Sequence, residues 1–484
     1  MTVKRISAVE VVLWVFALIL LLLVVSPFVL GFKIKNDYAA VVADVSDLIQ
    51  ADIRIISYER GFFSSNVVLN IGLNSVPFKF KLKEEIIHGP IYLGLINQGK
   101  SPFVAAVASG ELLPPVELSA QIKQLFSNKS PLVYQNVINF SGSIVSESYI
   151  PAINKVIATD PGELKVNSSG VTMTSTYSPQ AGRLSGDASM PFFSLAAEAE
   201  KLDVKDLNLN YSGEVGENAL LIGDSMLTLG LLDYHSNGDQ LSVRSFNIQT
   251  MTNEQGQFMN SQLQMNAQEI LASDVKLGPV AFNVSINGLD ASKIHELQAV
   301  QKEMEQKLQQ GIPNEQVTAM YAGQMMGLLP DLLKQSEIKV HPLKVESELG
   351  TLTSDMTFSI EGLDASAPAD PLFILNALNL DMNLQIDEAL LRQMIKWELM
   401  SNDQLAAGNE AARKAEKALP VDQKVNENIR GLLDEDWLTV EDRVYHSNLS
   451  FHQGQMLLNG KSIDPVAHFM SQMAPPAAEN SVSP

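Results

Sequence analysis

The stretch VVLNIGLN, residues 67–74, alternates large apolar side chains with small or polar ones. Its odd-numbered residues are all apolar, and they would share one face of a strand because successive strand side chains point to opposite faces. The stretch FKFKLK, residues 78–83, repeats the alternation with lysine on its polar side. A proline-containing turn at residues 75–77 separates the two stretches. Together they predict two adjacent antiparallel strands.

The same alternation recurs along most of the chain. Further examples are residues 137–140, 207–211, 243–248 and 280–286. Many long amphipathic strands are typical of one extended antiparallel sheet with one covered face and one solvated face. Such a sheet must curl, split or be capped.

Three segments with helical periodicity are candidate caps for this sheet. They are residues 291–310, 316–335 and 387–419. The predicted fold class is therefore α+β, with a large, extended, curved antiparallel β-sheet and packed helices behind a single N-terminal transmembrane helix.

That transmembrane helix is predicted from Val11 to Phe32, a run of 22 residues with no charge. At about 1.5 Å per residue it would span roughly 33 Å, close to the roughly 30 Å of a bilayer's hydrocarbon core. A cleaved signal peptide is the alternative, but its apolar region would be shorter and followed by a small-residue cleavage site. Residues 26–33 offer no convincing site, so an uncleaved anchor is favoured.

The flanking charges leave the orientation of this helix open, because Lys4 and Arg5 precede it while Lys33 and Lys35 follow it. A short head before a long body favours export of the body, since long domains cross largely regardless of charge. The predicted organisation is a cytoplasmic head at 1–10, an anchor at 11–32 and a periplasmic β-rich domain at 33–474. Helical insertions are expected at about 290–336 and 387–432, with a disordered tail at 475–484.

Composition excludes several classes of function. The net charge of −21 would repel nucleic acid and anionic lipid headgroups, so neither is expected to bind through a basic patch. There is no cysteine, which excludes disulfides, thiolate metal sites and a cysteine nucleophile. The chain also has no zinc motif, glycine-rich phosphate loop or nucleophile elbow. Neither a catalytic residue nor a metal or cofactor site is predicted.

Two local clusters combine aromatic, charged, glycine and proline residues. The first is expected to turn at Gly61, to pair Arg60 with an acid and to bury Phe62 or Phe63. The second indicates a strand that ends in a Gly-Pro turn. A docking or ligand-contact role is the functional alternative for both clusters, and a titrating role is an alternative for His88. The candidate contact or structural residues are Tyr58, Arg60, Gly61, Phe62, Phe63, Ser64, Ser65, His88, Gly89 and Pro90.

These two clusters resemble motifs of the YdgA-like family, the bacterial domain-of-unknown-function family numbered 945. Residues 58–65 are similar to its Tyr-x-Arg-Gly-x-Phe-Ser-Ser stretch, and residues 88–90 to its His-Gly-Pro. Residues 457–461 are similar to the Leu-Asn-Gly turn near the family's C-terminal end. The resemblance covers nearly the whole chain. It implies an inner-membrane protein that faces the periplasm and self-associates, with no assigned reaction and no cofactor.

Three functions remain open at this point. The first is a non-enzymatic binding or scaffolding module of the cell envelope that binds a protein partner or itself, because the edge strands of a sheet can pair with another chain. The second is binding or transfer of a lipid or other amphiphile in an apolar groove of the curled sheet. The third is a carboxylate-dependent hydrolase of envelope polymers, which would need two acids roughly 5–10 Å apart in a cleft.

Overall fold

The computed structural model divides the chain into two compact units. Unit 1 contains Met1–Glu214 and Leu232–Gly238, and unit 2 contains Val215–Leu231 and Asp239–Pro484. The structure describes residues 8–48, 51–73, 79–115, 118–158, 162–198, 200–236, 239–272, 275–309, 312–360, 377–406 and 420–463.

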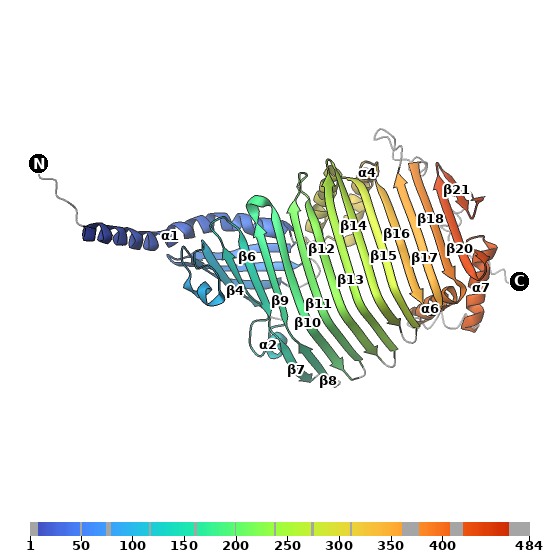
Figure 1. The fold of residues 1–484 in the computed structure, drawn as a ribbon, viewed down its shortest axis with the longest axis horizontal. Coiled ribbons are helices and arrows are strands. Elements are labelled where there is room, and N and C mark those ends of the chain that lie inside the picture. The colour runs from blue at the N-terminus through green and yellow to red at the C-terminus, as the bar shows by residue number, and fades with distance from the viewer. Residues whose placement is uncertain are drawn as a thin grey trace, which may run out of the picture. The chain divides into compact units, whose positions relative to one another are not determined.

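Unit 1 is an antiparallel meander that follows one long helix, α1 (Ala8–Leu48) (Figure 1). Its strands are β1 (Ala51–Arg60), β2 (Ser64–Leu73), β3 (Lys79–His88), β4 (Ala106–Leu113), β5 (Val133–Ile138), β6 (Ile144–Ile150), β7 (Ile153–Ala158), β8 (Glu163–Ser168), β9 (Val171–Ser178), β10 (Arg183–Ala197) and β11 (Glu200–Val215). Three short helices lie between strands: η1 (Leu93–Gln98), α2 (Ser119–Leu125) and η3 (Pro179–Ala181).

Consecutive strands pair from β1 to β6. Beyond β6, the short strands β8 and β9 pair with successive halves of β10. They therefore lie end to end and act as one long strand. β6 and β7 pair with β9 and β8 in the same way. β12 (Leu221–Ser236) contributes residues to both units.

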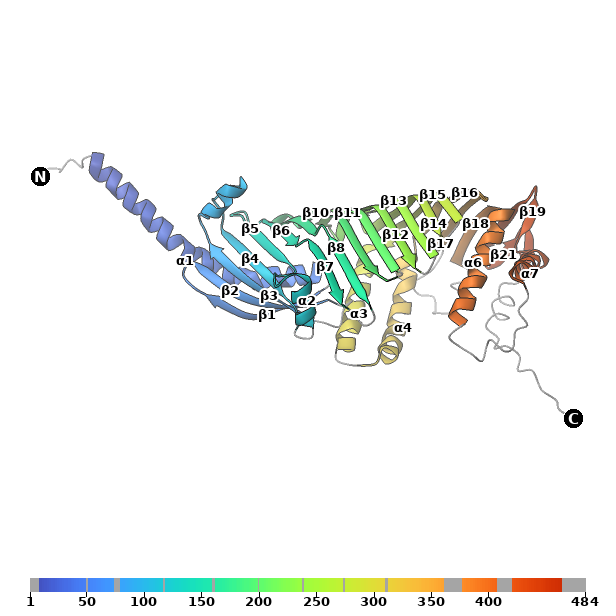
Figure 2. The same cartoon turned by 90° about the horizontal axis from the view of Figure 1, so that it is seen from below.

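Unit 2 is itself an antiparallel meander of mostly long strands and carries four further helices among its described residues (Figures 1 and 2). Its strands are β13 (Asp239–Gln255), β14 (Phe258–Ala272), β15 (Val275–Asp290), β16 (Glu337–Ser347), β17 (Gly350–Ile360), β18 (Leu378–Asp387), β19 (Thr439–Glu441), β20 (Val444–His452), β21 (Gln455–Leu458) and β22 (Lys461–Ile463). Its helices are α3 (Ala291–Gln309), α4 (Asn314–Leu333), α6 (Glu388–Ala406) and α7 (Val421–Asp434).

The register of unit 2 separates apolar and polar side chains onto opposite faces of its sheet. One cross-strand row is entirely apolar, and we call it the central row: Leu263, Val284, Val340, Met356, Met382 and Leu449. The row one residue further along each strand lies on the other face and is entirely polar: Gln262, Ser285, Lys339, Thr357, Asp381 and Ser450. The period of two in the sequence has therefore produced an amphipathic sheet.

The helices of unit 2 cover the two ends of the apolar face. Leu333 of α4 packs with Phe358 and Ile360 at one end of the strands. At the other end Leu390 and Ile395 of α6 pack with strand residues that include Ile386. Figure 2 shows α3, α4 and α6 on the same side of this sheet. The central row lies between these two groups of helices, and its members remain half-buried.

Side-chain chemistry at the helix ends explains why these helices begin where they do. The carboxylate of Asp290 accepts hydrogen bonds from the backbone N–H groups of Ser292 and Lys293, at 2.9 and 3.3 Å, and so caps α3. Helix α7 follows Pro420, which suits the start of a helix because its fixed backbone angle is already helical or extended. α7 buries Val425 and Ile429, which lie on one face because they are four residues apart.

The predicted transmembrane helix is contradicted. Among the helices that the structure describes, none has a stretch that is both long and apolar enough to cross a bilayer. The described side chains of α1 begin at Val25, and every run of 18 residues from there to the end of the helix contains Lys33, Lys35 and Asp37. The prediction of a single-pass inner-membrane protein with its body in the periplasm, joined to the membrane by this helix, is corrected accordingly.

Other predicted elements differ in their bounds. The helix expected over 387–419 is described as α6 up to Ala406, and the rest of that segment lies outside the described residues. The strands expected at 67–74 and 78–83 correspond to β2 and β3, and residues 74–78, which include the expected turn, lie outside the described residues. The expected tail at 475–484 also lies outside the described residues.

Replacing Leu390 tests the packing of α6 on the sheet. Leu390 is 1% exposed and belongs to the core cluster that joins α6 and α7 to the strands. Leu390→Ala should lower the free energy of unfolding of unit 2 by about 2–5 kcal/mol, because it removes buried methyl groups and leaves a cavity. Urea denaturation measures this change. Met394→Ala on the same helix is the control, since Met394 is 41% exposed and its truncation should change stability by no more than about 0.5 kcal/mol.

Candidate functional site

The two clusters singled out in the sequence meet in unit 1. The turn between β1 and β2 lies beside the end of β3, where the N–H of His88 donates to the carbonyl of Phe63 at 2.8 Å. The side chains of Ser65 and His88 are also in contact, with 2.9 Å between Oγ and Nε2. Residues 58–65 and 88–90 therefore form one site, although 22 residues separate Ser65 from His88 in the chain.

The hydrogen bonds of His88 define its tautomer. Its Nδ1 lies 3.3 Å from the carbonyl oxygen of Phe62, which can only accept, so Nδ1 carries the hydrogen. Nε2 is then the acceptor for the hydroxyl of Ser65. Burial lowers the pKa of His88 and outweighs the hydrogen bond to Phe62, which acts in the opposite direction. The imidazole is therefore held in its neutral form.

Helix α1 packs directly against the His88 side chain and covers this site. A Cβ placed on Gly31 would overlap the ring of His88, so only glycine allows the helix to approach this closely. Ser65 is fully buried and His88 is 3% exposed. A serine hydroxyl donating to a neutral histidine is the arrangement of a nucleophile and its base. Here the backbone of α1 occupies the space where a substrate would have to approach.

Arg60 binds to α1 through aromatic rings. Its guanidinium lies 4.3 Å from the ring centre of Phe28 and 4.2 Å from that of Phe32, and it donates to the carbonyl of Phe28 at 3.3 Å. Among the described residues no carboxylate lies within ion-pair distance of this guanidinium. The described residues therefore do not show the expected pairing with an acid. Cation–π contacts of this kind stabilise by about 0.5–2 kcal/mol each.

The turn residues themselves are exposed. Gly61 makes the turn, with its N–H donating to the carbonyl of Ser64 at 2.8 Å, as the sequence predicted. Phe62 and Phe63 are 44% and 58% exposed, so neither enters the core as expected. The ring of Phe62 instead packs against Phe28 of α1, with 5.3 Å between ring centres.

A buried acid adds a second contact between α1 and the sheet. Glu84 of β3 is 4% exposed and accepts a hydrogen bond from the hydroxyl of Tyr38 on α1. The rings of Tyr38 and Tyr58 pack edge to face, with 5.4 Å between their centres. Burial raises the pKa of Glu84, and the phenols of Tyr38 and Tyr134 only partly oppose this rise.

Gly89 and Pro90 connect β3 to the chain that leads into β4. The N–H of Gly89 donates to the carbonyl of Ala105 at 2.7 Å, and the carbonyl of Pro90 accepts from Val104 at 3.2 Å. A Cβ on Gly89 would overlap the carbonyl of Val104. The Gly-Pro turn predicted here is thus a close backbone crossing that orients His88 toward Ser65.

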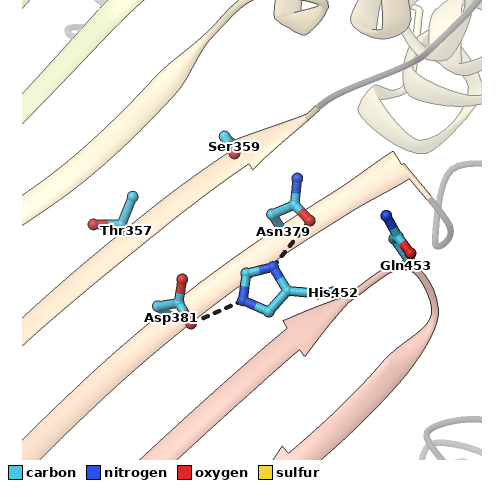
Figure 3. A pocket seen from close by; sticks show the side chains of 6 residues that line it. All are labelled: Thr357, Ser359, Asn379, Asp381, His452 and Gln453. Atoms are coloured by element: carbon cyan, nitrogen blue, oxygen red, sulfur yellow. Dashed lines mark hydrogen bonds and ion pairs between the residues drawn. The ribbon is translucent and has the colours of Figure 1, made fainter.

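A second candidate site lies on the polar face of unit 2. It is an open cavity of about 370 Å³ lined by Thr357, Ser359, Asn379, Asp381, His452 and Gln453 (Figure 3). Nε2 of His452 lies 2.9 Å from the carboxylate of Asp381, and Nδ1 lies 3.1 Å from the amide oxygen of Asn379. Figure 3 shows the imidazole between these two side chains. We call this the polar pocket.

No motif in the sequence reveals the polar pocket. Asp381 and His452 are 71 residues apart and meet because β18 and β20 pair in the register that places Asp381 opposite Ser450. His446 and His452 both lie on β20, so these two histidines do not come from adjacent strands. Only the register of three paired strands could have predicted this cluster.

A metal site is a separate question. Within the part of the chain that the structure describes, no three histidine, aspartate or glutamate side chains converge to hold a metal ion. In the polar pocket both ring nitrogens of His452 lie within hydrogen-bond distance of side-chain oxygens of Asp381 and Asn379.

Comparison with known proteins gives one match. A family model described as bacterial protein of unknown function (DUF945) matches residues 8–466. The chain belongs to this family. No curated protein and no solved structure matches. The family resemblance seen in residues 58–65 and 88–90 is thereby confirmed. Four of these residues, Tyr58, Arg60, Phe62 and His88, contact α1.

Gly31→Leu should loosen α1 from unit 1, because the new side chain cannot share the space of the His88 ring. Hydrogen–deuterium exchange should then become faster in α1 from Val25 onward and in the 61–65 turn. Val29→Leu is the control, since Val29 is 57% exposed and points away from this contact. Unchanged exchange in Gly31→Leu would show that α1 does not depend on this close approach.

Glu84→Gln should remove a pH dependence of stability. A carboxyl group whose pKa is raised in the folded protein stabilises the fold when protonated, and this contribution is lost as the pH rises above the ordinary value of 4.5. The difference in unfolding free energy between Glu84→Gln and the parent chain should therefore shift in favour of the glutamine variant between pH 4.5 and 8. Chemical denaturation at several pH values measures this difference. Glu85→Gln, at the exposed neighbouring position, should show no such shift.

Proposed function

We propose that this chain is a non-enzymatic binding protein that holds the apolar chain of an amphiphile against the sheet of unit 2. The observation that carries the proposal is the central row, which lies on the same face as the helices and is half-buried. Half-buried apolar residues at the centre of an amphipathic sheet favour a ligand, because a monomer normally covers such a surface with its own elements.

The length of the central row suits an acyl chain. It crosses six strands, β14 to β18 and β20, and neighbouring strands are about 4.8 Å apart, so the row is about 24 Å long. One leaflet of a bilayer's hydrocarbon core is about 15 Å thick, which is the reach of a single lipid chain. An extended acyl chain lying across the strands would fit within the row.

The chemistry of the row supports binding rather than catalysis. Its side chains are those of Leu, Val and Met, which offer no nucleophile, acid or base. Met356 and Met382 are directly opposite each other at its centre, and methionine side chains adapt to apolar ligands of irregular shape. On α6, Met394 is 41% exposed and Trp397 is half-buried.

Scaffolding through a protein partner or a second copy is a further candidate, because the same apolar row would also bind a protein surface. A carboxylate-dependent hydrolase is supported less, since Asp381 is the only acid among the described residues that line the polar pocket. These alternatives predict different outcomes in the experiment that follows.

Met356→Lys should abolish acyl-chain binding, because the new charge would have to be desolvated within the apolar row. The measurement is the fluorescence of cis-parinaric acid titrated with the full chain, and affinity should fall at least about tenfold, or 1.4 kcal/mol. Met394→Lys is the matched control on an exposed site. Equal binding by the parent chain and Met356→Lys would contradict the proposal. Absence of binding together with a concentration-dependent dimer in sedimentation would favour scaffolding instead.

A further inference from the structure

The polar pocket lies on the opposite face of unit 2 from the central row, and acyl-chain binding does not use it. Thr357 faces Asp381 across β17 and β18, and Ser359 faces Asn379 in the same pair of strands. These residues point to the face opposite Met356 and Met382 because they alternate with them along the strands. The two faces can therefore serve different ligands.

We propose that the polar pocket binds a neutral saccharide. The geometry that points to this ligand is the set of hydroxyl and carboxamide groups arranged around the His452–Asp381 pair (Figure 3). Hydroxyls and carboxamides each offer both donors and acceptors, as the hydroxyl groups of a sugar do. A cavity of about 370 Å³ lies within the range of roughly 300–1,000 Å³ typical of small-ligand sites.

The pocket is accessible and held in shape. The side chains of His452 and Asp381 are 50% and 54% exposed, so a ligand can reach them without any opening of the fold. The contact of His452 with both Asp381 and Asn379 fixes its ring. Gln453 lies at the tip of the β20–β21 hairpin, where Gln453 and Gly454 both have positive φ as a tight two-residue turn requires.

Charge favours a neutral ligand over an ionic one. The carboxylate of Asp381 would repel an anion, and the net charge of −21 adds a long-range field of the same sign. A cation would have to compete with His452, which already occupies one oxygen of this carboxylate. A multiply hydroxylated neutral ligand can use the remaining oxygen of Asp381 as an acceptor.

The same face extends the pocket into a polar surface that suits a chain of sugars. Pairs of asparagine side chains are hydrogen-bonded across neighbouring strands: Asn247 with Asn266 at 3.2 Å, Asn253 with Asn260 at 3.2 Å, and Asn383 with Asn448 at 2.5 Å. Each amide in such a pair keeps at least one donor or acceptor for a ligand. Between these pairs the same face carries Ser285, Lys339 and Thr357, so polar side chains continue across the strands and an oligosaccharide could cross several of them.

The test is binding of the purified full chain to a printed array that carries neutral glycans together with sialylated and sulfated ones. The parent chain should retain one or more neutral glycans. Asp381→Ala and Ser359→Ala should weaken this binding, the first by at least about tenfold because it removes a charged hydrogen-bond acceptor. Met394→Ala, at an exposed position on α6 and away from the polar face, is the control and should bind like the parent chain.

Retention of anionic glycans alone, retention of no glycan, or unchanged binding by Asp381→Ala would each overturn the proposal. Circular dichroism and urea denaturation establish that the variants are folded, which is expected since Asp381 is exposed. Met356→Lys should keep its glycan binding while it loses cis-parinaric acid. These two measurements distinguish a failure of the saccharide proposal from a failure of the acyl-chain proposal.

Discussion

The structure depends on the two-residue period of the β-strand. In a single layer of strands this period divides every segment into two chemical faces, and a shift of one residue between neighbours would exchange them. The sheet of unit 2 keeps its faces separate across six strands even though bulges interrupt the pairing of β15 with β16 and of β16 with β17. The bulges restore the alternation on both sides, so the apolar and polar rows remain continuous.

A different kind of contact holds α1 to unit 1. Close backbone approach at Gly31, the rings around Arg60 and the hydrogen bond from Tyr38 to Glu84 lie along one side of the helix. Two of these contacts involve buried polar side chains, His88 beneath Gly31 and Glu84 beside Tyr38. Each of these side chains would be costly to leave without a hydrogen-bond partner. Several motif residues that this chain shares with its family, among them Arg60 and His88, therefore join a helix to a sheet.

Sequence reasoning predicts the strands well because alternation is a local property. Residues 67–73 and 280–286 contain enough apolar positions to define a face, and they are strands in the structure. Sequence reasoning fails for Phe62 and Phe63. An apolar side chain is expected to be buried, but its actual exposure depends on which element packs over the turn. It also misses Asp381 and His452, because their meeting requires the pairing of strands that are distant in the chain. The membrane helix was inferred from the length and lack of charge of residues 11–32. The side chains of α1 that the structure describes begin at Val25, so this stretch includes Lys33, Lys35 and Asp37 and is not apolar enough to cross a bilayer.

The meander has a consequence for how the chain folds. Among the described strands most pairings join neighbours in the sequence, and the hairpins of unit 2 close over turns as short as Gln453–Gly454. Contacts between near neighbours require little loop-closure entropy, so contact order is low for a β-rich protein of this size. Each new hairpin can dock on the strand synthesised just before it. The sheet can therefore grow in one direction during translation, with the first-made strand as its template.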